Sequence, residues 1–419
     1  MRTYSKQLAL AAAALFAIFL GIQFIRPELP RPPVTGDIDV PQPVKQVLRK
    51  SCYDCHSNQT KLAWFDQIVP AYWLVLDDVK RARGHLNFSE IGRLPPAQQR
   101  GALFEAVNQM QFGAMPLKSY AIAHPESRIT PAEVAVLKQY LIEFDPIPVA
   151  KEQDDTWPSR PVTAVNVRPA LNGIAFVPGY KDWKVISSTD RFDNHTIRVV
   201  LGNDVAVRAV ESNHVNPWPD GTMFAKVAWE PTRKFVQVEF MIKDKSKYAS
   251  TKGWGFARWK GNELAPYGKN AAFAEECVGC HTPMRDNDFV FTTPVPRAAD
   301  GLPNNPFEYQ VINASADSKD GTMSMLYGNY VAVRSARGSS HPNYPSGSVL
   351  SLVTWAQRDD DHWFGARVPG RVKSVEFVTV GPGPASYQEF TGLPFKRTAP
   401  NDGDSRTNDI LRQRALLMP

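Results

Sequence analysis

The four cysteines of the chain lie in two copies of one pattern. The first copy is Cys52-Tyr53-Asp54-Cys55-His56 and the second is Cys277-Val278-Gly279-Cys280-His281. In a Cys-x-x-Cys-His pattern the two thiols form thioethers to the vinyl groups of a haem, and the adjacent imidazole binds the iron as its proximal ligand. Because the two copies use every cysteine, the sequence predicts two covalently bound c-type haems. Cys52, Cys55, Cys277 and Cys280 would hold them, with His56 and His281 as iron ligands.

Other uses of paired cysteines fit this sequence less well. A zinc site shared by four thiolates would join knuckles more than 220 residues apart and leave both histidines unexplained. A thioredoxin-like redox site needs a βαβ context that neither copy shows. Four cysteines in 419 residues are also too few for a disulfide scaffold.

The N-terminus has the features of an export segment. Arg2 and Lys6 precede the apolar stretch 8–25, and Arg26 closes it. This stretch is short for a bilayer span and long for the apolar part of a signal peptide. We expect an uncleaved membrane anchor over residues 1–26, with a cleaved signal or a buried helix as alternatives. Either of the first two readings places the rest of the chain on the periplasmic side of a bacterial inner membrane.

The composition excludes a globally disordered chain and argues against a protein that binds nucleic acid. The chain has 22 Phe, 10 Trp and 13 Tyr, which is enough for several cores and excludes disorder as a global description. The net charge is +6, but Lys and Arg do not gather in runs, so no nucleic acid partner is expected. Six prolines in residues 27–43 favour an extended linker that holds the first domain off the membrane.

Residues 44–145 form a first module with the apolar spacing of helices. Thr130 as N-cap, Pro131 at the first helical position and Glu133 in the first turn mark the start of its last helix. The sequence therefore predicts a small all-α domain around one haem. The segments with helical spacing are 44–50, 71–83, 95–111 and 130–144.

A haem that only carries electrons needs a sixth iron ligand. Met115 stands in the loop Gly113-Ala114-Met115-Pro116-Leu117 between two expected helices, and thioether ligation raises the reduction potential of a haem. Core filling is the plain alternative for a methionine. His85 is the competing ligand, with a role toward a haem propionate or in the core as its own alternative.

This module resembles the bacterial haem-binding domain of exported multi-haem proteins. The resemblance rests on residues 50–60, which contain the first motif, together with Ile68-Val69-Pro70, residues 85–89 and Met115-Pro116-Leu117. It implies a monohaem electron carrier similar to cytochrome c.

A polar linker over residues 145–160 leads to a second module, residues 160–300, with short alternating apolar runs. Asp220-Gly221 and Lys252-Gly253 are turn signals, and a short helix over 270–276 delivers the second haem motif. The sequence therefore predicts that the second haem is held against a β-sheet. The runs that predict strands are 183–187, 196–201, 205–210, 223–229, 235–242 and 254–259.

The second module resembles cytochrome P-460 and its relative cytochrome c′-beta. The match rests on Tyr180 to Trp183, Ile197-Arg198, Pro219 to Thr222 followed by Lys226, Val238 to Asp244, and Cys277 to His281 followed by Asp288 to Thr292. The resemblance implies that Lys226 bonds covalently to the haem, a solvated strand lysine being its alternative. It also implies that Glu239 is a distal carboxylate that relays protons, and that Arg198 lies near the haem.

No Met-Pro loop follows His281 at ligand distance, and nothing else in the second module is an obvious sixth ligand. We therefore expect the second iron to be five-coordinate and open to small molecules.

Residues 305–395 repeat the second module without its haem motif. Residues 201–210 align with 327–336 at six identities in ten. Glu239 recurs as Glu376, which weakens its catalytic role, whereas Lys226 aligns with Leu352. Because the related cytochromes are homodimers, we expect this repeat to act as an internal partner in a pseudo-dimer. The polar tail, residues 396–419, is expected to wrap the fold or to be loosely ordered.

The expected fold is multidomain α + β, with a small all-α cytochrome c-like domain followed by two β-rich domains. The expected function is redox chemistry on hydroxylamine or nitric oxide at the second haem, with electrons passed through the first haem to a redox partner protein. One alternative is a nitric oxide binding protein with an apolar cap from Phe240, Trp254 and Phe256. The other is a cytochrome that only transfers electrons.

Overall fold

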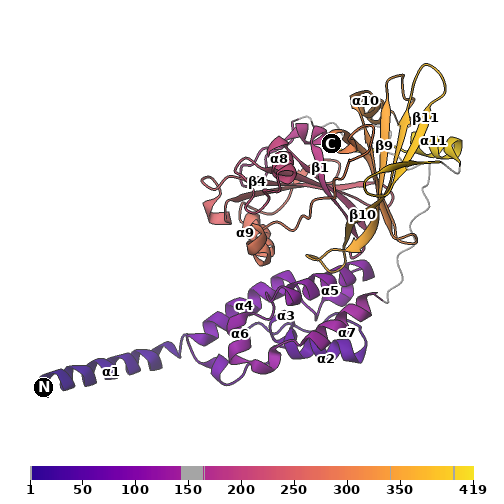
Figure 1. Cartoon of the computed structure of the whole chain (residues 1–419). Coiled ribbons are helices and arrows are strands. Elements are labelled where there is room, and N and C mark those ends of the chain that lie inside the picture. The colour runs from indigo at the N-terminus through magenta and orange to yellow at the C-terminus, as the bar shows by residue number, and fades with distance from the viewer. Residues whose placement is uncertain (1, 143–163, 165, 340, 400–401) are drawn as a thin grey trace. The chain divides into compact units, whose positions relative to one another are not determined.

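The computed structural model describes residues 2–142, 164, 166–339, 341–399 and 402–419. The chain divides into two compact units, Met1–Asp145 and Pro146–Pro419 (Figure 1). The linker expected over 145–160 lies outside the described residues.

The first unit is helical, as the apolar spacing predicted. Thr130 caps its last helix: the Thr130 N–H donates to Glu133 Oε2 at 2.8 Å, and the Glu133 N–H donates to Thr130 Oγ1 at 3.3 Å. This reciprocal pair satisfies two N–H groups that a helix start otherwise leaves without partners. The helices are α1 (Arg2–Ile22), α2 (Gln42–Ser51), α3 (Tyr53–His56), α4 (Ala71–His85), α5 (Pro96–Gln111), α6 (Lys118–Ala123) and α7 (Pro131–Ile142).

The proline-rich segment 27–43, expected as an extended linker that holds the first domain off the membrane, packs against that domain. Ile38 is buried, and its N–H donates to the Phe88 carbonyl at 3.1 Å. The Asn58 side chain donates to the Pro33 carbonyl at 3.0 Å. Prolines cannot donate from their own nitrogen, but their carbonyls accept, and here the domain supplies the donors. The segment therefore lies along the first unit as part of it.

No helix within the described residues combines the length and the apolar character needed to cross a membrane. The anchor expected over residues 1–26 stays a prediction.

The second unit is built on one antiparallel sheet of 12 strands (Figure 1). Its main path has the order β6-β5-β4-β3-β2-β1-β10-β9-β8-β7, with β11 beside β10 and β12 beside β11. The strands are β1 (Lys184–Arg191), β2 (Thr196–Gly202), β3 (Met223–Trp229), β4 (Phe235–Lys243), β5 (Trp254–Lys260), β6 (Ala265–Pro266), β7 (Gln310–Asp317), β8 (Thr322–Gly328), β9 (Val349–Asp359), β10 (Arg367–Thr379), β11 (Ser386–Thr391) and β12 (Lys396–Thr398). The helices are α8 (Asp204–Glu211), α9 (Phe273–His281), α10 (Tyr330–Gly338) and α11 (Gly403–Leu411).

The strand expected over residues 205–210 is wrong, because this segment is helix α8. The Asn203 side chain accepts the Ala206 N–H at 3.1 Å and so caps the helix. A Cβ at Gly202 would lie 2.5 Å from the Ile186 side chain, so only glycine lets the helix start this close to β1. The alternating Val and Ala residues fit a strand and a short helix equally well, and the cap decides between them.

The two halves of the sheet follow the same plan. Elements β1-β2-α8-β3-β4-β5 of the first half correspond in order and pairing to β7-β8-α10-β9-β10-β11 of the second. Asn329 caps α10 as Asn203 caps α8, with its side chain accepting the Ala332 N–H at 3.1 Å. We call these halves the first copy and the second copy.

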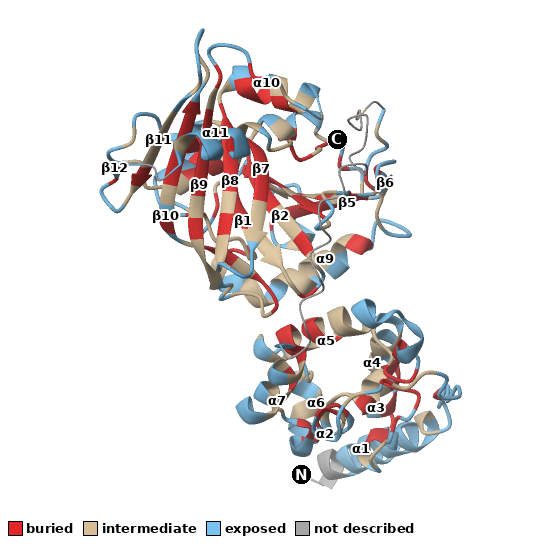
Figure 2. Cartoon of the chain, turned by 90° about the vertical axis from the view of Figure 1, so that its right-hand side faces the viewer, coloured by how far each residue is buried: buried red, intermediate tan, exposed pale blue. Residues whose placement is uncertain are grey.

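One hydrophobic core joins the two copies. Val227 and Trp229 of the first copy and Trp355 of the second belong to it. Figure 2 shows β9, which carries Trp355, as buried over part of its length. The C-terminal tail enters the same core through Leu416, and the Trp229 indole N–H donates to the Leu417 carbonyl at 2.8 Å. The two copies and the tail therefore share one interior.

Helix α11 of the tail is fastened to Glu376, the residue that aligns with Glu239. Two N–H groups of Arg406 donate to the Glu376 carboxylate at 2.9 and 2.7 Å, and the Tyr387 hydroxyl donates to it at 2.7 Å. Glu376 is only 4% exposed. Its presence in a copy without a haem motif thus has a structural reason.

Arg406→Met is expected to lower the free energy of unfolding of the second unit. The change removes the charged donors of a buried carboxylate, which costs about 1–3 kcal/mol. Urea unfolding of the full chain, followed by circular dichroism, measures the loss. Arg397→Met, at an exposed position of β12, is the control and should change stability by less than about 0.5 kcal/mol. Equal stability of the two variants would contradict the structural role of the Glu376 pair.

Candidate haem sites

The first motif lies where α2 passes into α3. The His56 Nδ1 atom lies 3.1 Å from the Leu86 carbonyl oxygen, to which Nδ1–H donates. This bond sets the tautomer and leaves Nε2 as the atom that can bind a metal. Burial lowers the pKa of His56, which keeps the imidazole neutral as a ligand must be. The local geometry therefore suits an iron ligand.

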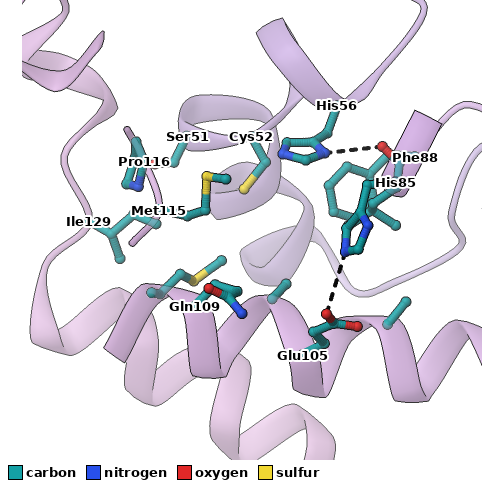
Figure 3. Close-up of a pocket in the computed structure, with 14 residues that line it drawn as sticks. Ser51, Cys52, His56, His85, Phe88, Glu105, Gln109, Met115, Pro116 and Ile129 are labelled. Atoms are coloured by element: carbon teal, nitrogen blue, oxygen red, sulfur yellow. Dashed lines mark hydrogen bonds and ion pairs between the residues drawn. The ribbon is translucent and has the colours of Figure 1, made fainter. Parts of the chain in front are cut away.

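A hollow that opens to solvent lies beside this motif, and the empty space in it, solvent-exposed part included, is about 670 Å³. Figure 3 shows Cys52, His56 and Met115 converging on it from different segments of the unit. Of the two thiols of the motif, Cys52 lines the hollow, whereas Cys55 packs against the neighbouring apolar cluster of Val69 and Leu76. The Cys52 thiol, an imidazole with Nε2 available, a thioether and a mostly apolar wall are donors and surroundings that suit a covalently bound haem. The residues that line the hollow are Ser51, Cys52, His56, His85, Leu86, Phe88, Ala102, Glu105, Ala106, Gln109, Met110, Met115, Pro116 and Ile129.

The predicted ligand Met115 and its competitor His85 both line this hollow, and so does Met110, which the sequence reasoning missed. His85 has a side chain that is 70% exposed, and its Nε2 atom lies 3.4 Å from Glu105 Oε1. Met110 lies on α5 within a regular helical pattern, so nothing in the sequence distinguished it from a core residue.

Hydrogen bonds on both sides hold the loop that carries Met115. Before the loop, the Met115 N–H donates to the Gln109 carbonyl at 3.2 Å, across a turn where Gly113 has a φ of +63°. After the loop, the Tyr120 hydroxyl of α6 donates to Asp54 Oδ2 at 3.2 Å. Asp54 lies inside the haem motif, so α6, which directly follows the loop, is hydrogen-bonded to the motif.

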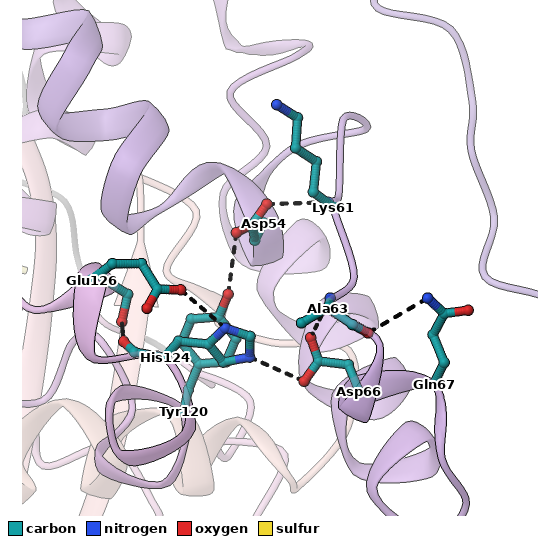
Figure 4. A network of polar contacts seen from close by, with 9 residues as sticks. Asp54, Lys61, Ala63, Asp66, Gln67, Tyr120, His124 and Glu126 are labelled. Atoms are coloured by element: carbon teal, nitrogen blue, oxygen red, sulfur yellow. Dashed lines mark hydrogen bonds and ion pairs between the residues drawn. The ribbon is translucent and has the colours of Figure 1, made fainter.

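A buried histidine extends this connection (Figure 4). His124 is 5% exposed, and its Nε2 atom lies 3.0 Å from Asp66 Oδ1 while its Nδ1 atom lies 3.3 Å from Glu126 Oε1. Its ring stacks on Tyr120 with centroids 4.1 Å apart. The network therefore fixes α6, and with it the Met115 loop, to the segment before α4. No motif marked these residues in the sequence.

Met115→Leu is expected to lower the reduction potential of the first haem. Axial ligands set haem potentials over about 0.8 V, so loss of a thioether ligand should lower the potential by on the order of 0.1 V. Optical redox titration of the full chain measures the shift. Met110→Leu is the matched control, since Met110 lines the same hollow. A shift in the Met110 variant and none in the Met115 variant would contradict the assignment.

The second motif lies on α9, which packs against β5. The His281 Nδ1 atom lies 2.7 Å from the Phe289 carbonyl oxygen, so this imidazole too donates to a backbone carbonyl and keeps Nε2 for a metal. Burial lowers the pKa of His281 to about 4. The rings of Phe256 and Phe291 lie 5.1 and 5.0 Å from the His281 ring.

A buried ion pair holds the turn that supplies the Phe289 carbonyl. Lys243 Nζ lies 2.6 Å from Asp288 Oδ1, and the two side chains are 2% and 10% exposed. Asp288 and Phe289 have φ values of 48° and 64°, in the left-handed region that side chains other than glycine rarely adopt. The ion pair therefore keeps an unfavourable turn in the position that His281 needs.

Charged side chains meet on one face of the first copy's sheet. Lys226, Glu239 and Arg258 stand directly opposite one another on β3, β4 and β5. Lys226 forms an ion pair with Glu239, and Arg258 Nε lies 2.6 Å from Glu239 Oε1. Arg198 lies on the same face, two residues before the partner of Lys226 on β2. The structure thus brings the three predicted residues together and adds Arg258, which only the strand register reveals.

This face carries more positive than negative charge. Burial raises the pKa of the Glu239 carboxyl, but the charges of Lys226, Arg258 and Arg198 outweigh it and lower the pKa below its usual range. Burial and the neighbouring Arg191 charge lower the pKa of Arg198 to about 9. An excess of cations beside the Cys277 thiol and an available imidazole fits a haem with its two propionates.

Phe240 does not belong to this face, so it cannot be the apolar cap that was expected. Adjacent strand residues point to opposite sides of a sheet, and Phe240 packs in the core shared by the two copies. Trp254 and Phe256 lie on the same face as Arg258, where they pack with Cys277 and Val278 of α9. Of the three aromatic residues, these two lie on the side of the motif.

Family comparisons agree with this geometry. Residues 17–143 match the family model of the haem-binding domain, and residues 177–292 match that of cytochrome P460. The chain is a haem cytochrome. A helical haem-binding domain comes first, and a cytochrome P460 domain on an antiparallel sheet follows, which confirms both predicted resemblances and their order. A search of curated proteins found no match.

Proposed function

We propose that this protein is a dihaem cytochrome that oxidises hydroxylamine, or a related small nitrogen species, at the second haem site. The observation that carries the proposal is the position of Glu239. Its carboxylate lies between Lys226 and Arg258, with which it forms ion pairs. The charges of these three side chains influence the pKa of His281, the predicted iron ligand. A carboxylate kept at such a place is suited to take protons from a substrate.

Oxidation of hydroxylamine, NH2OH, to nitroxyl, HNO, releases two electrons and two protons. A bound haem iron supplies a site for the nitrogen ligand and accepts electrons. The chain must then supply the proton acceptor. Glu239 is ionised and lies beside Lys226 and Arg258, which orient it through their ion pairs. A positioned general base of this kind contributes about 10²- to 10⁴-fold to a rate.

Lys226 is the proposed site of a covalent bond to the second haem. The amine nitrogen would replace a hydrogen on a haem carbon, with loss of two protons and two electrons, so the bond would form only with an added oxidant of the peroxide class. Burial lowers the pKa of Lys226, so its amine loses a proton more easily than that of an exposed lysine. A lysine bonded to the haem would also no longer carry the full charge that depresses the pKa of Glu239. The bond would therefore make Glu239 a better base near neutral pH.

The first haem is the proposed exit for electrons. Its hollow offers a thioether, Met115, beside the imidazole of His56, and this ligand pair raises the potential so that electrons flow toward it. We propose a redox partner protein as the final acceptor. We also propose that both haems lie on the periplasmic side of the inner membrane, attached through the apolar stretch 8–25.

Glu239→Gln is expected to reduce turnover of hydroxylamine about 10²- to 10⁴-fold while both haems stay attached. Stopped-flow reduction of the first haem measures turnover, and the intact mass counts the haems. Glu376→Gln is the matched control, because it changes the equivalent strand position in the copy without a haem motif. Its effect should be on stability alone. Unchanged turnover in Glu239→Gln would remove Glu239 from the mechanism.

Nitric oxide binding is a second candidate function. It is favoured by Trp254 and Phe256, which give the side of the sheet that packs with Cys277 and Val278 an apolar part. In that case the wild-type protein would bind nitric oxide and leave hydroxylamine unchanged, and Glu239→Gln would not alter the affinity for nitric oxide.

A further inference from the structure

The second copy has a longer hairpin than the first at one place. Val353 follows Val227 by 126 positions, whereas Val375 follows Val238 by 137 positions, so the β9-β10 hairpin has 11 more residues than the β3-β4 hairpin. The extra length forms the ends of β9 and β10 and the loop 360–366.

The lengthened hairpin contacts the first copy. The Trp363 indole N–H donates to Asp193 Oδ2 at 2.9 Å, and the Arg191 guanidinium lies 4.3 Å from the Trp363 ring centroid. The Asp193 N–H donates to the Gly365 carbonyl at 3.1 Å. Asp190 of β1 pairs with Arg367 of β10 in the sheet. Side-chain and backbone contacts together thus fix the hairpin on the first copy.

The same loop reaches the segment that follows the second haem motif. The His362 Nδ1 atom lies 2.9 Å from the Phe291 carbonyl oxygen, and the rings of Trp363 and Phe291 are 5.8 Å apart. Phe291 in turn lies 5.0 Å from the His281 ring. A continuous set of contacts therefore runs from the second copy to the predicted iron ligand.

A second set of contacts leads from Trp363 to the charged face. Arg191, which lies over the Trp363 ring, is paired across the sheet with Thr196 of β2. The Thr196 hydroxyl accepts a hydrogen bond from Arg198 Nε at 3.1 Å. The loop is thus connected both to the motif and to Arg198.

We propose that His362 and Trp363 are positioning residues for the second haem site, supplied by the copy that has no haem motif. Phe291 is packed between His281 and Trp363, while His362 holds its backbone. Outer contacts of this kind fix the orientation of a metal-binding imidazole and tune the metal. The inference rests on the proposed haem at the second motif, and it does not depend on the substrate. The copy without a haem motif is then an internal partner that completes the site.

Trp363→Ala in the haem-loaded full chain is the principal test. The change removes the contact between the Trp363 and Phe291 rings. Because Phe291 packs on the His281 ring, that ring is then less well fixed. We expect a shifted midpoint potential and a broadened electron paramagnetic resonance signal for the second haem, with the first haem unchanged. Trp363→Phe keeps a ring against Phe291 and should restore wild-type values. Tyr330→Ala, at a 69% exposed aromatic of the same copy, is the control.

Wild-type values for the second haem in a folded Trp363→Ala protein would overturn the proposal. If that variant does not fold, His362→Ala replaces it, since it removes the side-chain contact to the Phe291 carbonyl and leaves the Trp363 ring in place. An unchanged second haem would again overturn the proposal. Hydroxylamine turnover is not the readout, so the result is separate from the test of Glu239. If the intact mass of the wild-type protein shows one haem and peptide mapping finds none at Cys277 and Cys280, this proposal and the dihaem proposal are overturned together.

Discussion

A histidine that binds iron through Nε2 needs its Nδ1 proton held in place, and much of this structure serves that need. His56 donates to the Leu86 carbonyl and His281 donates to the Phe289 carbonyl, at 3.1 and 2.7 Å. The two carbonyls are held by different means. Leu86 follows directly on α4, whose regular helix positions it. Phe289 lies in a left-handed turn, which needs the buried pair of Lys243 and Asp288 to stay where it is.

The two copies show how a residue at the same strand position can have different roles. Glu239 and Glu376 occupy equivalent strand positions, but a different helix packs beside each of the two copies: α9 against β5, and α11 against β10 and β11. In the second copy α11 brings Arg406, which binds Glu376 with two hydrogen bonds and closes the position. In the first copy α9 carries the haem motif, and the carboxylate is left to Lys226 and Arg258 on neighbouring strands. The difference lies in what covers the sheet rather than in the sheet.

The sequence predicted the motifs, the helical first unit and most strands because these depend on local spacing. It also predicted the start of α7, since Thr130 and Glu133 form a local pair. The helix α8 was missed because Val and Ala alternate there in a way that suits both periods. Arg258 and the pair of Lys243 and Asp288 could not be found, since they depend on strand register and on a contact 45 residues apart. Phe240 was assigned to the wrong face, although alternation along β4 places it opposite Glu239.

The central claim is that the second site reacts with a small nitrogen species and the first site carries its electrons away. Anaerobic addition of hydroxylamine to the fully oxidised full-length protein, followed by optical spectroscopy that resolves the two haems, tests it most directly. The account predicts that the first haem becomes reduced after hydroxylamine binds at the second. A ligand-bound second haem with the first haem still oxidised, or no spectral change at either haem, would contradict it.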